Sequence, residues 1–554
     1  MLETIKTFSA LSEEFVELSL KHNPVRATQA GLHDYDAQLP NDSPDGFKER
    51  SQWLRDLEQR LAASVPWQEL PADHRVDYAL LRSAIVTQRA DLEEIRVHQK
   101  NPALYPQTAL TGLYLLLARP FAPLEERKEA LLARMLAIPD YLKEARANLQ
   151  EVPEAWLNIA VDVNLAGPGF VDEVCRTLER SFPGEGERIE HAGSRARQGF
   201  FQYGQFMESE LEKKIGGTFA IGERWMNHRL ERTHMLSLDC AAVEALGREH
   251  VERISGMPDE EAKRIDPARS WRELIAEARG RHPEATKVRE AYAAEVERAR
   301  RFVAEKRIAP IPEGEKLVVA DTPVFQRTMV PLAAYLPPAP FDEDQTGHLF
   351  VTPVDTARRK DDQVQQLEQH SYAELALVAV HETFPGHHVQ LLHAHKAGSR
   401  LRRMSESPLL VEGWALYCEE LMHTEGYYLE PMTRLFQLRD LLWRACRVVV
   451  DVGLQRETFT FMQAVDYLVQ TAMVERVNAV SEVRRYTMTP TQPLAFLLGK
   501  LELDALRDEV RRKQGAQFNL HAFHAELLSL GSLPPALLRE ELLPRLEQQP
   551  KQPG

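Results

Sequence analysis

Apolar residues recur at helical spacing along most of this 554-residue chain, with Glu, Arg and other polar residues between them. Steps of three and four put such residues on one side of a helix, so the pattern predicts amphipathic helices with buried stripes. One stripe consists of Val288, Tyr292, Val296, Ala299 and Val303. A second, which Pro139 is expected to kink, consists of Leu131, Leu132, Met135, Leu136, Ile138, Tyr141 and Leu142.

The segment 308–356 departs from the helical pattern. Prolines recur through it, and two short β-rich runs, 316–320 and 348–352, lie between them. Proline removes a backbone donor and interrupts a helix, so this segment predicts a small sheet. We therefore expect a mainly α protein with a helical region at 1–307 forming one wall of a cleft, a β-rich segment at 308–356, and a helical region at 357–554. The three regions are expected to form one continuous structural unit.

The composition of the chain excludes several classes of protein. Hydrophobic residues make up 44% of the chain, enough for a large interior, and the formal net charge of −15 argues against nucleic acid and against an anionic membrane. Four scattered cysteines favour reduced, buried thiols over a disulfide framework. The first residues lack the pattern of a secretory signal, and no apolar run approaches membrane length. We expect a cytoplasmic monomer or homodimer.

The candidate chemistry begins at His381-Glu382, in the run HETFPGHH that ends at His388. A helical zinc-peptidase motif needs a second His four residues after the first, and Pro385 stands there instead. Pro385 cannot donate to the carbonyl of His381, so the helix is expected to break across 384–386. If the break takes up two residues, His387 occupies the second ligand position, and His388 is the alternative.

Glu412 is the expected third ligand, 31 residues after His381 and followed by Gly-Trp. Two imidazoles and one carboxylate suit one Zn²⁺ per chain, with a fourth position left for water. Glu382 would then be the general base that takes the proton of this water. The alternative is a His-rich turn without metal, with Glu412 as a carboxylate at a helix N-terminus.

The pattern resembles known peptidases. The pair Gly386-His387 is similar to the end of the motif in thermostable carboxypeptidases and thimet-type oligopeptidases. The whole run 381–388, followed by EGWALY at 412–417, resembles the bacterial domain-of-unknown-function 885 family, which is grouped with the gluzincin-like zinc metallopeptidases. The segments 23–36 and 482–499 resemble the two ends of that family. The resemblance implies a multi-helix metallopeptidase-like fold around a deep cleft, with a small β-sheet next to the active-site helix.

The resemblance also implies roles near the C-terminus. Tyr486 is the candidate donor to the oxyanion of the tetrahedral intermediate, and Arg484 and Arg485 are candidates for binding a substrate carboxylate. Two positions depart from the family pattern: Phe496 stands where Tyr is frequent, and Gln455 stands where His is expected.

The sequence therefore predicts a zinc-dependent hydrolase that cleaves short peptides, as a carboxypeptidase or an oligopeptidase, with Glu382 as general base. One alternative is a metal-dependent amidohydrolase acting on a non-peptide amide. Another is a non-catalytic binding protein built on a peptidase scaffold.

Overall fold

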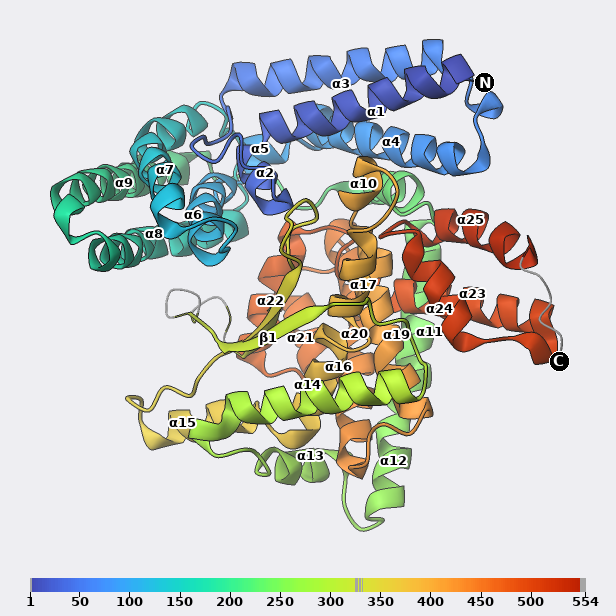
Figure 1. Ribbon diagram of the computed structural model, residues 1–554. Coiled ribbons are helices and arrows are strands. Elements are labelled where there is room, and N and C mark those ends of the chain that lie inside the picture. Colours follow the sequence, from blue (N-terminus) through green and yellow to red (C-terminus); the bar gives the residue numbers. More distant parts are fainter. Residues whose placement is uncertain (1, 324–326, 328–329, 331, 549–554) are drawn as a thin grey trace. The chain divides into compact units, whose positions relative to one another are not determined.

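The computed structural model describes residues 2–323, 327, 330 and 332–548. The chain is mainly helical with one small sheet, as the sequence predicts (Figure 1). It divides into two compact units, the first made of Met1–Ile221 with Ala339–Asp344, the second of Gly222–Pro338 with Gln345–Gly554. The helices between 222 and 307 thus belong to the second unit, whereas the sequence pattern groups them with the N-terminal region.

The first unit is helical. Its α-helices are α1 (Leu2–His22), α2 (Pro24–Ala30), α3 (Pro44–Ser64), α4 (Ala72–Ala90), α5 (Val97–Lys100), α6 (Leu104–Ala118), α7 (Leu124–Ala145), α8 (Glu154–Ser181) and α9 (Gly186–Phe206). Short 3₁₀ and π turns follow several of them: η1 (Trp67–Glu69), η2 (Asp91–Ile95), η3 (Pro183–Glu185), η4 (Met207–Leu211) and η5 (Glu212–Lys214). Asn23 and Ser43 cap α2 and α3 ahead of a proline in the first turn, which is the favoured way to start a helix.

The stripe predicted in α7 is buried except at one position. Leu136 is 41% exposed, which corrects its assignment to the core. It follows Met135, which is fully buried, and one residue turns a helix by about 100°, so Leu136 faces away from that side. Pro139 lies inside α7, and the helix continues past it.

A histidine clamp holds the connection 339–344 within the first unit. His33 follows α2; its Nδ1 lies 2.9 Å from Asp36 Oδ2, and its Nε2 lies 3.2 Å from Asp342 Oδ1. The ring also stacks on Phe121 at a centroid distance of 3.6 Å. Gly31 adopts a positive φ of 84°, and a Cβ there would lie 2.5 Å from Asp342 Oδ1, so glycine suits both the turn and the close approach.

The second unit carries the remaining elements. Its helices before the sheet are α10 (Gly222–His228), η6 (Arg229–Thr233), α11 (Cys240–Ser255), α12 (Met257–Ile265), α13 (Trp271–Arg279), η7 (Ala285–Lys287) and α14 (Val288–Glu305). Those after it are α15 (Lys360–Glu368), α16 (Tyr372–Glu382), α17 (His387–Ala394), α18 (Arg400–Arg403), α19 (Pro408–Thr424), α20 (Pro431–Gln455), α21 (Phe461–Thr471), α22 (Arg476–Met488), α23 (Ala495–Gln514), η9 (Gly515–Gln517), α24 (Leu520–Ser529) and α25 (Pro535–Gln548). The stripe predicted in α14 is buried at all five positions.

The sheet has the strand order β1-β3-β2. Strand β1 (Lys316–Asp321) pairs parallel with β3 (Thr346–Val351), and β2 (Ala333–Leu336) pairs antiparallel with β3. Both predicted β-rich runs lie on strands, except that Thr352 follows the end of β3, and β2 is an addition that the sequence pattern missed. Strand β2 lies at the edge of the sheet and packs against α16.

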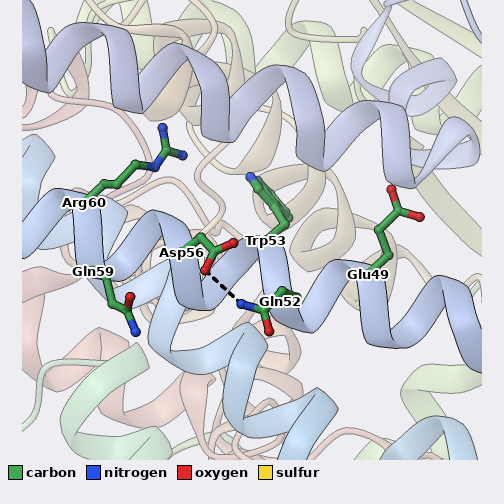
Figure 2. A pocket seen from close by; sticks show the side chains of 6 residues that line it. All are labelled: Glu49, Gln52, Trp53, Asp56, Gln59 and Arg60. Atoms are coloured by element: carbon green, nitrogen blue, oxygen red, sulfur yellow. Dashed lines mark hydrogen bonds between the residues drawn. The ribbon is translucent and has the colours of Figure 1, made fainter.

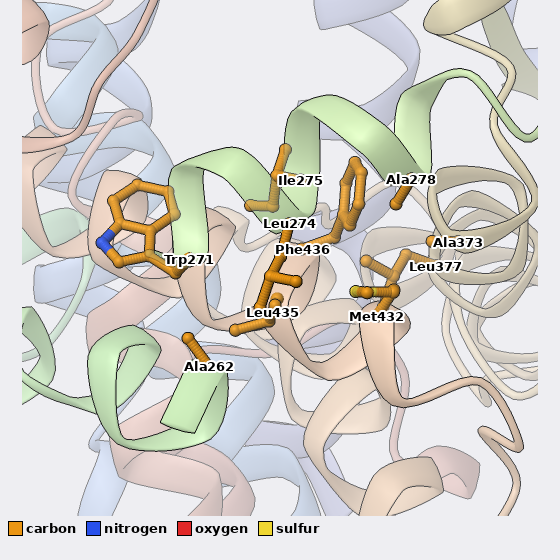
Figure 3. Packing of buried hydrophobic residues seen from close by; sticks show 10 residues of the cluster. All are labelled: Ala262, Trp271, Leu274, Ile275, Ala278, Ala373, Leu377, Met432, Leu435 and Phe436. Carbon is orange, nitrogen blue, oxygen red and sulfur yellow. The ribbon is translucent and has the colours of Figure 1, made fainter. Parts of the chain in front are cut away.

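Buried apolar side chains fix α16 in the second unit. Figure 3 shows the cluster that joins α12, α13, α16 and α20, built from Ala262, Trp271, Leu274, Ile275, Ala278, Ala373, Leu377, Met432, Leu435 and Phe436. Full burial of each large apolar side chain stabilises such packing by roughly 1.5–3 kcal/mol. The N-terminal half of α16 is therefore anchored, and its C-terminal end carries His381 and Glu382.

Candidate metal centre

The helix that carries His381 breaks where the sequence predicts. Helix α16 ends at Glu382, and α17 begins at His387. Between them Gly386 donates its N–H to the carbonyl of Val380 at 3.1 Å. A Cβ on Gly386 would lie 1.9 Å from the carbonyl oxygen of His381, so glycine alone fits this turn. The break thereby replaces the single helical turn that a standard motif would use.

Close packing brings α19 to this break. A Cβ on Gly413 would lie 2.5 Å from backbone atoms of Gly499 on α23, so the two helices can cross this closely only through glycine. Trp414 is fully buried, and its Nε1 donates to the carbonyl of Pro385 at 2.8 Å. The Gly-Trp pair after Glu412 therefore has a structural role: it holds the Glu412 carboxylate beside the turn between α16 and α17.

The structure brings His381, His387 and Glu412 together. One ligand atom from each lies within 4.8 Å of the others. Glu412 Oε2 lies 3.9 Å from His381 Nε2 and 3.6 Å from His387 Nε2. Three ligand atoms on one tetrahedral Zn²⁺ would be about 3.4 Å apart, given ordinary zinc–ligand bond lengths. The two imidazoles and the carboxylate thus fit a zinc ion with small side-chain shifts.

Glu419 supports the first of these ligands. Its Oε1 accepts the Nδ1–H of His381 at 2.8 Å, and its side chain is 3% exposed. A hydrogen bond at Nδ1 fixes the tautomer and leaves Nε2 free to bind a metal. The sequence analysis missed this residue, although its spacing of seven residues, two helical turns, after Glu412 puts both carboxylates on one face of α19.

The two histidines differ in their titration. Burial, with a smaller contribution from the neighbouring His381, lowers the pKa of His387 to about 4. His387 is thus neutral near pH 7, the form that binds a metal. Burial also opposes protonation of His381, but the hydrogen bond to Glu419 together with the charges of Glu419 and Glu382 outweighs it and raises that pKa above its ordinary value. Within the described residues, His387 Nδ1 has no hydrogen-bond partner.

His388, the alternative ligand, is engaged elsewhere. It is fully buried; its Nδ1 lies 2.9 Å from the hydroxyl of Tyr335, and its Nε2 lies 3.1 Å from Glu315 Oε2. Both ring nitrogens therefore have partners. The geometry places His387, rather than His388, with His381 and Glu412.

Glu382, the expected general base, ends α16 beside these ligands. Its side chain is partly exposed, and its charge acts on the imidazoles of both His381 and His387. It stands outside the group of three ligand atoms. This position suits a carboxylate that accepts a proton from a metal-bound water.

The expected substrate-binding residues lie on α22 and differ from one another. The hydroxyl of Tyr486, which is fully buried, donates to Glu482 Oε2 at 2.7 Å. Arg485 donates to the same oxygen at 2.9 Å and to Gln492 at 2.7 Å, and the charge of Glu412 acts on its guanidinium. Arg484 is exposed. Tyr486 and Arg485 are therefore tied to protein partners, and a substrate would have to compete with Glu482 for them.

Two arginines on α20 that the sequence analysis did not single out extend this cluster. Arg447 donates to Glu482 Oε2 at 3.0 Å, and its guanidinium lies 4.8 Å from the centre of the Phe496 ring. Arg444 lies 6.0 Å from the same ring, and its charge partly opposes the rise in the pKa of His381. Phe496 is one of the two departures from the family pattern. Its ring thus offers an apolar contact to the guanidinium groups of Arg444 and Arg447.

Gln455, the other departure, is a buried residue at the end of α20. Its side chain is fully buried, and its Nε2 donates to the backbone carbonyl of Tyr486 at 3.4 Å. It therefore supports the helix that carries the arginines and Tyr486 and does not itself belong to the group of three ligand atoms.

The first unit contains a separate surface hollow of about 690 Å³ on α3. Figure 2 shows its lining, which consists of Glu49, Gln52, Trp53, Asp56, Gln59 and Arg60. Gln52 and Asp56 bond each other at 2.8 Å, and Arg60 is paired with Glu14. Among the described residues, the side chains grouped closely enough to hold a metal ion are His381, His387 and Glu412, and no such group lies on α3. The hollow is therefore not the candidate site.

The fold and the site define a mainly helical protein with a candidate two-histidine, one-glutamate metal centre. Residues 24–542 match the family described as "Bacterial protein of unknown function (DUF885)", and the chain belongs to this family. A search of curated proteins finds no match.

Solved structures share the fold over nearly the whole chain. One is "a putative lipoprotein of unknown function" from Shewanella oneidensis, 23% identical, with a TM-score of 0.80 and coverage of 97% of this chain and 99% of that one. Another is a "putative lipoprotein" from Colwellia psychrerythraea, 17% identical, with a TM-score of 0.84 and coverage of 99% and 100%. At these identities the likeness establishes the fold alone. In the part of this chain that the structure describes, no helix combines the length and apolarity of a membrane span.

Proposed function

We propose that this protein is a zinc-dependent hydrolase that cleaves peptide bonds in short peptides, with one Zn²⁺ held by His381, His387 and Glu412. The observation that carries the proposal is the convergence of these three ligand atoms within 4.8 Å of one another. The hydrogen bond from His381 to Glu419 supports it, because metal-binding histidines commonly donate their other N–H to a carboxylate. A solvated His-rich turn would need neither feature.

The residues at the site suit amide hydrolysis. When bound, zinc would polarise the scissile carbonyl and lower the pKa of its water toward about 7. Glu382 accepts the proton of that water on a carboxylate oxygen and passes it to the leaving amine. Tyr486 is the proposed oxyanion donor, for which its hydroxyl must turn from Glu482 to the substrate.

The surroundings favour a peptide as the substrate. Strand β2 is an edge strand that packs against α16, and an edge strand can pair with an extended peptide through main-chain hydrogen bonds. Arg485 and Arg444 interact electrostatically with Glu412 and His381, so cationic groups lie near the ligands. A free C-terminal carboxylate suits them, and we propose removal of residues from the C-terminal end. Arg484 remains a candidate for the outer part of such a site.

The test of this proposal is mass spectrometry of short peptides incubated with the zinc-loaded protein. Peptides with free C-termini should lose residues from that end, and C-terminally amidated peptides should be cleaved poorly. Equal cleavage of both, or internal cuts, would indicate an oligopeptidase. Cleavage of non-peptide amides alone would indicate an amidohydrolase, and zinc binding without any hydrolysis would indicate a binding protein.

The same site predicts that Glu382→Gln retains zinc and loses nearly all hydrolysis, because an amide cannot accept the proton. Near-native turnover in this variant would remove Glu382 from the role of general base. Glu425→Gln, an equivalent change beyond the last turn of α19, is the control and should turn over normally.

The cellular location is a separate proposal. The sequence favours the cytoplasm, while two proteins that share the fold are described as putative lipoproteins. Fractionation of cells that express the native gene would decide between a soluble and a membrane-attached protein.

A further inference from the structure

A chain of hydrogen bonds runs from the sheet through His388, the residue after the proposed ligand His387, to an arginine on α14 whose side chain is 45% exposed. The hydroxyl of Tyr335, on edge strand β2, lies 2.9 Å from His388 Nδ1. On the other side of the ring, His388 Nε2 lies 3.1 Å from Glu315 Oε2. Glu315 in turn accepts from Arg300 Nε on α14 at 2.6 Å. The order is thus Tyr335, His388, Glu315 and Arg300.

Burial and close packing both constrain these hydrogen bonds. His388 is fully buried, and the side chain of Glu315 is 5% exposed, so polar groups there need partners. A Cβ on Gly347 of β3 would lie 2.6 Å from the Tyr335 hydroxyl and 2.8 Å from His388 Nδ1, so glycine leaves the room for their bond. Three elements, β2, β3 and α17, meet at this one contact.

The directions of the bonds follow from the groups. A carboxylate can only accept, so Glu315 requires a proton on His388 Nε2. In the neutral imidazole Nδ1 is then an acceptor, and the hydroxyl of Tyr335 donates to it. Glu315 therefore selects the tautomer that holds Tyr335, and Tyr335 holds β2.

We propose that His388 is a positioning residue that fastens edge strand β2 to the first turn of α17, and thereby sets where an extended peptide paired with β2 meets the metal. The inference rests on the proposed function, since it assigns β2 to the binding of the peptide backbone. His388 itself touches neither metal nor substrate. Because His388 directly follows His387 in the chain, its contact with Tyr335 links β2 to the proposed ligand through one peptide bond.

The test uses binding without turnover. In a Glu382→Gln background loaded with zinc, the affinity for a six-residue peptide and for a dipeptide is measured by calorimetry. Adding Tyr335→Phe should weaken binding of the longer peptide about tenfold, the scale of one lost hydrogen bond with its ordering effect. The dipeptide, too short to pair along β2, should bind nearly as before, and zinc content should not change.

Tyr372→Phe is the matched control, because it makes the same change at a side chain that is 52% exposed. His388→Asn is the second variant: its amide can keep an acceptor near the position of Nδ1 while losing Glu315, so it should bind the longer peptide more tightly than His388→Ala. In the active enzyme, Tyr335→Phe should also spread the cleavage positions, which a loss of stability alone would not do.

The outcomes separate the two proposals. Equal affinity of the longer peptide in Tyr335→Phe and its parent, or an equal loss for both peptides, overturns the role of His388 and leaves the hydrolase intact. Loss of zinc in Tyr335→Phe would make the contact a part of the metal site and also overturn it. If the parent binds no peptide and the wild-type protein cleaves none, the proposed function itself fails.

Discussion

Glu419 offers a quantitative test of the candidate metal centre. The carboxylate is buried, with 3% exposure, and its Oε1 accepts the 2.8 Å hydrogen bond from His381 Nδ1. Removing such a partner commonly costs ten- to a hundredfold in metal affinity, or about 1.4–2.7 kcal/mol. Glu419→Ala should therefore weaken zinc binding by that factor. Glu419→Gln keeps an acceptor oxygen but loses the charge, so its affinity should lie between those of the alanine variant and the wild type.

The assay is competition for zinc against a chromophoric chelator at pH 7. Glu420→Ala is the control, since Glu420 lies next to Glu419 on α19 but pairs with Arg434 at 2.7 Å. Its zinc affinity should equal that of the wild type. The reasoning is refuted if Glu419→Ala binds zinc as tightly as the wild type, or if Glu420→Ala loses as much.

Two further predictions concern the two units separately. Although burial lowers the pKa of His33, hydrogen bonds to two aspartates raise it to about 9. This pKa exceeds the value near 6.5 in the unfolded chain. The pairing of His33 with Asp36 and Asp342 therefore stabilises the folded state in full below about pH 6.5, and this stabilisation is lost as pH rises through 9. The difference in free energy of unfolding between wild type and His33→Gln, about 1–2 kcal/mol after discounting for solvent, should therefore shrink from pH 6 to 9.5, and a constant difference would contradict the ion pairs. Gly386→Ala should abolish zinc binding, because its Cβ would lie 1.9 Å from the carbonyl of His381, while Gly398→Ala, with open space around it, should not; zinc retained by Gly386→Ala would refute the proposed turn.

The sequence predicts the helical fold and the break in the motif helix because both depend on local chemistry. A helical stripe such as that of α14 follows from spacing. Proline removes a backbone donor, so Pro385 with Gly386 favours a break in the helix, although the pair Pro168-Gly169 lies inside α8. Strand β2 escaped notice because a run of four residues between prolines carries no clear alternation. Its place depends on pairing with β3, which is a property of the folded chain.

The sequence does not decide which of two neighbouring polar residues belongs to the candidate site, because the answer depends on partners far away in the chain. His387 and His388 look alike in sequence, and the structure distinguishes them because Tyr335 and Glu315 occupy both nitrogens of His388. Tyr486 illustrates the same limit, since Glu482, one turn earlier, accepts its hydroxyl. Such contacts become visible only when segments far apart in the chain are brought together.

The central claim is that His381, His387 and Glu412 hold one zinc ion. Its most direct test is the zinc content of the purified, zinc-loaded wild-type protein and of His387→Ala and His388→Ala, measured by mass spectrometry of the metal. We predict about one zinc per chain in the wild type, a loss of zinc in His387→Ala, and retention in His388→Ala. Full zinc content in His387→Ala, or loss in His388→Ala alone, would contradict the proposed ligand set.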